Sequence, residues 1–92
     1  MSDHQPNLLF IYADQHRADV MGCAGNDIVV TPHLDRLASE GVRFDQTWTE
    51  SPICQPARAS LLTGRYPNDH GVLGNFAGDY QPEWDTFPRR LQ

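Results

Sequence analysis

The sequence has no lysine, no long apolar run and no closely spaced cysteines. Its basic residues are all arginines, scattered from Arg17 to Arg90, and 12 acidic residues bring the formal net charge to −5. No basic stripe is available to neutralise a phosphate backbone, so a nucleic-acid partner is disfavoured.

Membrane insertion and secretion have no support in the sequence. The longest apolar run, residues 8–13, is far shorter than the roughly 20 residues that a membrane-spanning helix requires. Residues 1–6 carry neither a basic segment nor an apolar core of the kind found in secretory leaders. We therefore expect no membrane span and a cytoplasmic location by default, with a periplasmic or secreted protein as the alternative.

The two cysteines, Cys23 and Cys54, are too few for a disulfide framework. A structural zinc site is also disfavoured. Such sites use short paired spacings, which the cysteines and the nearby His33 and His70 do not have.

The first half of the chain predicts a strand, a helix and a second strand. Residues 7–13 are almost entirely apolar, which is typical of a strand covered on both faces in a parallel α/β sheet. Thr31 as N-cap, a first-turn proline and Gly41 predict a helix over residues 32–40. The mostly alternating residues 42–48 predict the second strand, whereas residues 15–30 predict a loop with a short turn of helix.

In the second half, Pro56 is predicted to open a helix that Gly64 closes. Residues 66–85 predict a long loop, which in a compact domain usually has a functional role. Residues 86–92 resemble the opening turn of another helix. We therefore expect an N-terminal piece of a larger α/β protein, with Trp48 and Trp84 as packing residues.

Two groups of residues could carry chemistry. Asp14 and Gln15 follow the first predicted strand, where ligands of open α/β sheets bind, and their oxygens suit a hard divalent cation. The alternative is that Asp14 only caps the strand. Cys54 and Arg58, at the start of a helix, suit an oxyanion; the alternative is a small buried cysteine beside a surface arginine.

The spacing of Cys54 and Arg58 excludes one enzyme class. Cysteine phosphatases need five residues between the cysteine and the arginine, and this sequence has three. His70 and Asn75, in the predicted long loop, are within reach of the same site along the chain, although His70 is expected to be a surface or loop histidine.

A longer pattern surrounds these residues. Residues 54–65, CQPARASLLTGR, contain Cys-x-Pro-x-Arg followed by two leucines and Thr-Gly-Arg. Residues 6–15, 31–38 and 41–44 accompany it in the same order. Together they resemble the type I sulfatases, formylglycine-dependent enzymes of the alkaline phosphatase superfamily, over nearly the whole chain.

The resemblance implies a chemistry for Cys54. A formylglycine-generating enzyme would oxidise Cys54 to formylglycine, and one hydroxyl of the hydrated aldehyde would attack the sulfur of a sulfate ester and expel the alcohol. The other hydroxyl would then expel sulfate and restore the aldehyde, a step that an ordinary serine or cysteine adduct cannot take. The substrate would be a small-molecule or carbohydrate sulfate ester.

The resemblance also implies roles for the surrounding residues. Cys54 and Arg58 would be catalytic, and Asp14, Gln15 and Cys54 would bind a divalent metal, expected to be Ca²⁺, with Mg²⁺ or Mn²⁺ as alternatives. Two further residues match family positions: Asn75 lies at one close to the substrate sulfate, and Arg65 at one behind the active-site helix.

The implied fold is α/β, the N-terminal part of a sandwich with a large mixed, mainly parallel sheet. Residues 1–92 would be an incomplete fragment of the catalytic domain. Sulfatases take their other metal ligands and a substrate-binding lysine from later segments, so we expect the fragment alone to be inactive.

Three positions differ from the usual sulfatase pattern. Gln15 stands where many relatives have aspartate, Gln55 where a small residue is usual, and Ala57 where serine is commoner. Gln15 with Ala57 also resembles phosphonate monoester and phosphodiester hydrolases of the same superfamily. The alternatives are therefore such a hydrolase, or a non-catalytic module in which Cys54 stays a thiol.

Overall fold

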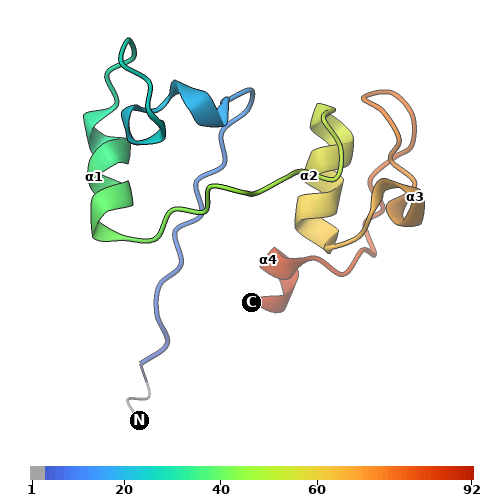
Figure 1. Ribbon diagram of the computed structural model, residues 1–92. Coiled ribbons are helices and arrows are strands. Elements are labelled where there is room, and N and C mark those ends of the chain that lie inside the picture. Colours follow the sequence, from blue (N-terminus) through green and yellow to red (C-terminus); the bar gives the residue numbers. More distant parts are fainter. Residues whose placement is uncertain (1–3) are drawn as a thin grey trace. The chain divides into compact units, whose positions relative to one another are not determined.

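The computed structural model describes residues 4–92 as two compact units, one reaching Arg43 and the other running from Phe44 to Gln92 (Figure 1). The prediction that residues 1–6 are not a secretory leader rests partly on residues 1–3, which lie outside the described residues. Among residues 4–92, no helix combines the length and apolar character needed to cross a bilayer.

The first unit contains two short 3₁₀ helices, η1 (Ala18–Val20) and η2 (Gly22–Ala24), and helix α1 (Pro32–Glu40). The helix predicted over residues 32–40 is confirmed. The loop with a short helical turn predicted over residues 15–30 is confirmed, since this segment contains both 3₁₀ helices.

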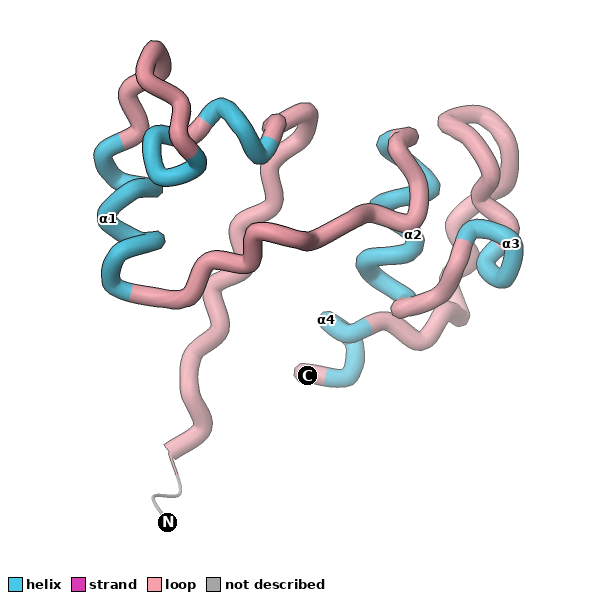
Figure 2. The backbone as a smooth tube through the Cα atoms, in the orientation of Figure 1, coloured by secondary structure: helices cyan, strands magenta, loops and turns pink. Residues whose placement is uncertain are grey.

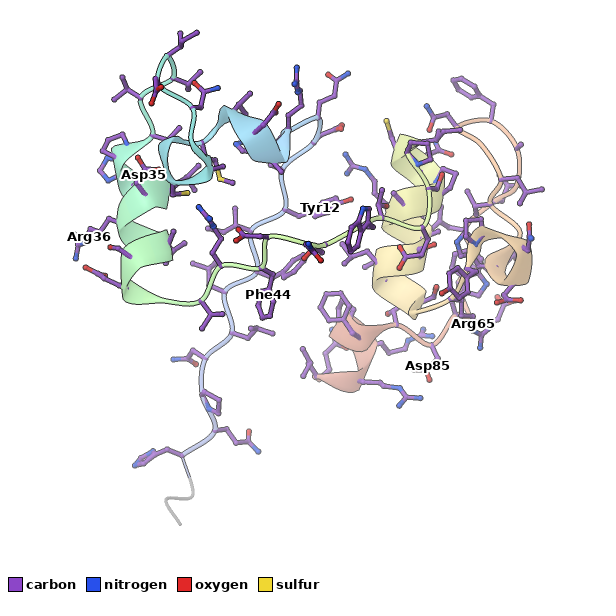
Figure 3. All side chains as sticks on the ribbon, viewed as in Figure 1. Tyr12, Asp35, Arg36, Phe44, Arg65 and Asp85 are labelled. Atoms are coloured by element: carbon purple, nitrogen blue, oxygen red, sulfur yellow. The ribbon has the colours of Figure 1, made fainter. Side chains whose placement is uncertain are left out.

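Thr31 precedes α1 but does not cap it in the predicted way, because its side chain makes no capping hydrogen bond. Its hydroxyl instead accepts the Gly22 N–H (2.8 Å) and donates to Asp35 Oδ1 (3.0 Å). Asp35 Oδ1 also accepts the Cys23 N–H at 2.7 Å. Gly22, Cys23, Thr31 and Asp35 therefore form a polar clasp that joins η2 to α1, with Asp35 seen on α1 in Figure 3.

The second unit contains α2 (Cys54–Thr63), α3 (Pro67–His70) and α4 (Phe87–Arg90). Helix α2 begins at Cys54, two residues before the predicted start at Pro56. Proline is tolerated within the first turn because N–H groups there have no intrahelical partner. Gly64 ends α2 as predicted, with φ 66° and its N–H donated to the Ser60 carbonyl at 2.8 Å.

The small core of the second unit lies between α2 and α3. Pro56, Ala59 and Ser60 form one buried face of α2, and α3, with Val72 just beyond it, supplies the other side. The predicted loop over residues 66–85 therefore includes a helix, α3. The predicted helical turn near residue 86 is confirmed by α4.

Neither predicted strand is present in the described part of the chain. Residues 7–13 and 42–48 are loops (Figure 2), and the described residues contain only an isolated bridge between Gly74 and Ala77. A strand requires a neighbour that accepts its hydrogen bonds, and no such ladder forms here. Leu8 and Leu9, which point to opposite faces of an extended segment, are 70% and 83% exposed, so neither face is covered there. The α/β class itself stays a prediction.

The clasp yields a testable prediction. Hydrogen bonds from the Cys23 N–H and the Thr31 hydroxyl hold the pKa of Asp35 below its ordinary value, against an opposing effect of desolvation. We expect Asp35→Ala to speed amide exchange of Gly22 and Cys23 and to lower the melting temperature. Asp27→Ala, which removes an exposed carboxylate from the same unit, is the control and should change neither.

The pH dependence has a defined sign. Because the folded-state pKa is lowered, protection of the Cys23 amide should be complete above about pH 4, the ordinary aspartate pKa. It should be lost as the pH falls through the lower folded-state value. Exchange measured by mass spectrometry, with correction for intrinsic rates, checks this. Equal pH dependence in the wild type and Asp35→Ala would contradict it.

Candidate active site

Helix α2 presents Cys54 and Arg58 on one exposed face. The two residues are four apart in a helix with 3.6 residues per turn, so their side chains are neighbours. Both are exposed, while Pro56, Ala59 and Ser60 bury the opposite face. Cys54 is a free thiol, which excludes the interpretation of a buried structural cysteine beside a surface arginine.

The segment after α3 returns to the first turn of α2. Asn75 Oδ1 accepts the Gln55 N–H at 3.1 Å, and the Tyr80 hydroxyl donates to the Gln55 carbonyl at 2.9 Å. Both backbone polar groups of the residue next to Cys54 are therefore held by this segment. The structure thus places Asn75 at the start of α2.

Asn75 occupies a tight turn. The Ala77 N–H donates to the Gly74 carbonyl at 3.3 Å, and the Leu73 N–H donates to the Ala77 carbonyl at 2.8 Å. Gly78 has φ 96°, and a Cβ there would lie 2.1 Å from the Gly71 carbonyl oxygen. Only glycine fits this close approach, which fixes the turn that carries Asn75.

The start of α2 offers an anion fewer backbone donors than a typical helix N-terminus. Pro56 has no N–H, and Asn75 already occupies the Gln55 N–H. Recognition of an oxyanion at this turn would therefore depend on side chains. Arg58 and the Asn75 amide nitrogen are the donors of suitable type near Cys54.

His70 is buried, contrary to the prediction of a surface or loop histidine. Its Nε2 lies 2.9 Å from Ser60 Oγ, and its Nδ1 accepts the Val72 N–H at 3.1 Å. The sequence did contain a signal for a short helix here, because Pro67 begins α3 and Gly71 ends it with φ 80°. That signal was missed in the glycine- and proline-rich stretch.

The two tryptophans have different surroundings. Trp84 is half-buried and packs as predicted, with its ring centroid 5.8 Å from that of His70 and 5.5 Å from that of Tyr80. Trp48 is 78% exposed. The prediction that Trp48 is a packing residue is therefore wrong for this structure, because no described side chain covers it.

Arg65 lies just beyond the C-terminal end of α2, away from Cys54, and is exposed. Figure 3 labels it with Asp85 in the same part of the second unit. A hydrogen bond from Arg90 holds the pKa of Asp85 below its ordinary value, and the charges of Arg65 and Arg89 act in the same direction. The predicted supporting role of Arg65 behind the active-site helix stays a prediction.

Asp14 and Gln15 belong to the first unit, whereas Cys54 belongs to the second. Gln15 has φ 56° and is the only non-glycine residue with positive φ among residues 4–92. Strained backbone of this kind clusters at functional sites. The carboxylate and amide oxygens also suit Ca²⁺ or Mg²⁺, so the donor chemistry of this pair fits a metal site.

Asp14 and Gln15 cannot form a whole metal site. Ca²⁺ takes six to eight oxygen ligands, and the described residues contain no group of three or more histidine, cysteine, aspartate or glutamate side chains able to hold a metal. Further ligands would have to come from outside this pair.

Comparison with known proteins identifies relatives along nearly the whole chain. A family model described as Sulfatase matches residues 6–89. The chain is 36% identical over 88 residues to N-acetylglucosamine-6-O-sulfatase of Bacteroides thetaiotaomicron, covering 96% of this chain and 16% of that protein. It is 43% identical over 97 residues to steryl-sulfatase of Rattus norvegicus, covering 95% of this chain and 17% of that protein.

A third relative is an ulvan-active sulfatase of Formosa agariphila, 48% identical over 71 residues, covering 77% of this chain and 14% of that protein. The chain thus spans less than a fifth of the length of these curated relatives. No solved structure matches it.

The contacts at Gln55 predict a specific effect of one hydroxyl group. Tyr80→Phe removes the hydrogen bond to the Gln55 carbonyl but keeps the ring beside Trp84. We expect faster amide exchange in the first turn of α2 and a loss of up to about 1 kcal/mol in unfolding free energy. Tyr66→Phe makes the same chemical change at a 67% exposed ring and should have no effect. Equal exchange in the two variants would contradict the prediction.

Proposed function

This chain belongs to the sulfatase family, and we propose that the complete protein hydrolyses sulfate esters of small molecules or carbohydrates, with Cys54 as the precursor of its nucleophile. One observation carries the proposal. Helix α2 presents Cys54 and Arg58 on an exposed face, and Asn75 is bound to the same turn through Gln55. This combines a nucleophile position with two donors for an oxyanion.

Cys54 acts after conversion of its thiol to the aldehyde of formylglycine by a formylglycine-generating enzyme. The exposure of Cys54 leaves this position open to a substrate. Arg58 orients the nucleophile and offsets the charge of the sulfate, because its guanidinium can donate two parallel hydrogen bonds to an oxyanion.

Asn75 binds a sulfate oxygen through its amide nitrogen. Its Oδ1 is already committed to the Gln55 N–H, so the amide cannot flip without losing that hydrogen bond. The NH₂ group is therefore the part of the side chain that remains to donate to the substrate.

Asp14 and Gln15 supply oxygen ligands to a divalent metal, with Ca²⁺ proposed and Mg²⁺ or Mn²⁺ as alternatives. When bound, such a metal lowers the pKa of a coordinated hydroxyl and offsets negative charge on the substrate. The positive φ of Gln15 supports a functional role for this turn.

The proposed architecture of the complete catalytic domain is an α/β sandwich with a mixed, mainly parallel sheet. The exposed apolar segment at residues 7–13 supports it, because a buried central strand requires apolar side chains on both faces. Residues 1–92 alone lack most of the metal ligands and should not turn over substrate.

A second candidate function is hydrolysis of phosphonate monoesters or phosphodiesters by the same residues. It is favoured by Gln15 and Ala57, which depart from the usual sulfatase pattern in the direction of those enzymes. A non-catalytic module with unmodified Cys54 is less well supported, because it gives no reason for an exposed thiol to share a helix face with Arg58 and a helical turn with the residue that Asn75 binds.

The substrate class is tested on the complete, matured protein. Aryl sulfate, aryl phosphonate and aryl phosphodiester substrates with one common leaving group should be compared by kcat/KM. We expect the sulfate ester to be preferred by at least about 100-fold, which corresponds to about 2.7 kcal/mol in transition-state binding. Cys54→Ala should abolish turnover. Preference for either phosphorus ester would select the second function.

Asn75 gives a charge test of substrate binding. Asn75→Asp keeps an acceptor for the Gln55 N–H but replaces the donating NH₂ by a negatively charged oxygen. We expect the melting temperature to stay within about 2 °C of wild type and KM for the sulfate ester to rise at least about tenfold, or 1.4 kcal/mol.

The matched control for this test is Asn68→Asp, which adds the same charge at an exposed position of α3. It separates local contact from a general change in net charge. Equal KM values in the Asn75→Asp and Asn68→Asp variants would show that Asn75 does not bind the substrate.

A further inference from the structure

His70 joins three segments of the second unit around one imidazole ring. The residue belongs to α3, its Nε2 lies 2.9 Å from Ser60 Oγ on α2, and its Nδ1 accepts the N–H of Val72 in the following segment. All three residues are buried, with exposed fractions of 7%, 4% and 0%. Figure 1 shows α3 beside α2.

The hydrogen bonds fix which ring nitrogen carries the proton. The Val72 N–H can only donate, so Nδ1 must be the unprotonated acceptor. The proton of the neutral ring is therefore on Nε2, which donates to Ser60 Oγ. Both nitrogens have a directional partner, and the ring also packs on Trp84. His70 therefore has one orientation in this unit.

This arrangement holds α2 at two heights. His70 holds Ser60 in the second turn, while Asn75 and Tyr80 hold Gln55 in the first turn. The two attachment points are about 7.5 Å apart along the axis, from a rise of 1.5 Å per residue. Trp84 contacts both His70 and Tyr80, so the two attachments are linked and resist sliding and rotation of the helix.

Rotation of α2 would move the reacting groups directly. Cys54 and Arg58 lie on the face opposite the buried one, so a turn of the helix about its axis displaces them relative to Asn75. Displacements of about 1 Å near reacting atoms can cost about 100-fold in rate. A polar attachment in the core is suited to prevent this, because it is directional whereas apolar packing is not.

We propose that His70 is a positioning residue: by donating from Nε2 to Ser60 and accepting the Val72 N–H at Nδ1, it fixes Cys54 on α2 relative to the segment that carries Asn75. The inference rests on the proposed function of Cys54 and Asn75. His70 itself is buried and does not contact the substrate.

The test uses the complete, matured protein and separates the two hydrogen bonds. Asparagine can replace the acceptor at Nδ1 but does not reach Ser60, whereas glutamine can replace the donor at Nε2. We expect Ser60→Ala and His70→Asn each to lower kcat for the sulfate ester about tenfold, with KM within twofold. The double variant, with both Ser60→Ala and His70→Asn, should have a kcat no lower than that of the poorer single variant. His70→Gln should retain most of the wild-type kcat.

Val72→Ala is the matched control for a merely structural role. It removes buried volume beside His70 but keeps the backbone N–H that donates to Nδ1. When Val72→Ala lowers the melting temperature as much as His70→Asn does, it should still keep kcat within twofold of wild type. A kcat loss in Val72→Ala equal to that in His70→Asn would overturn the proposal, as would an unchanged kcat in Ser60→Ala, a variant that favours the helix and should fold.

A second measurement does not depend on activity. Amide exchange of the peptide covering residues 54–59 should be at least about fivefold faster in Ser60→Ala than in Val72→Ala, because release at Ser60 loosens the whole helix. Equal exchange would overturn the proposal. If the wild type hydrolyses none of the esters, the proposed function fails, and the exchange comparison still decides whether His70 positions α2.

Discussion

The hydrogen bond from the Gln55 N–H to Asn75 Oδ1 connects the two parts of the candidate site in the second unit. It commits one of the few backbone donors at the start of α2 and fixes the orientation of the Asn75 amide. Oxyanion recognition beside Cys54 then depends on the Asn75 NH₂ group and Arg58. The turn closed by Gly78 and the contact from Tyr80 hold the Asn75 segment in place.

Local signals in the sequence predicted α1 and the C-terminal end of α2. Helix α1 has the predicted bounds, and Gly64 ends α2 in the left-handed conformation that glycine adopts easily. The position of a proline was a less reliable guide to the first residue of a helix. Pro56 lies in the first turn of α2 rather than at its first residue, because any position without an intrahelical N–H partner tolerates proline. Helix α2 therefore begins at Cys54, two residues before the predicted start.

Features that depend on distant partners were not predictable in the same way. Residues 7–13 have the composition of a buried strand, but a strand requires neighbours and none pairs with them among residues 4–92. Likewise, nothing local shows that His70 is buried, because its burial depends on Ser60 ten residues earlier and on Trp84. The metal pair, Asp14 and Gln15, was predicted by position, and its role stays a proposal supported by the backbone strain at Gln15.

The central claim is that Cys54 is the precursor of a formylglycine nucleophile. Its most direct test is mass spectrometry of the Cys54 peptide from the complete protein, co-expressed with a formylglycine-generating enzyme and compared with a peptide known to be converted. We expect the Cys54 thiol to be lost and an aldehyde that reacts with hydrazide to appear, while Cys23 stays a thiol. An intact thiol at Cys54 beside a converted control peptide would contradict it.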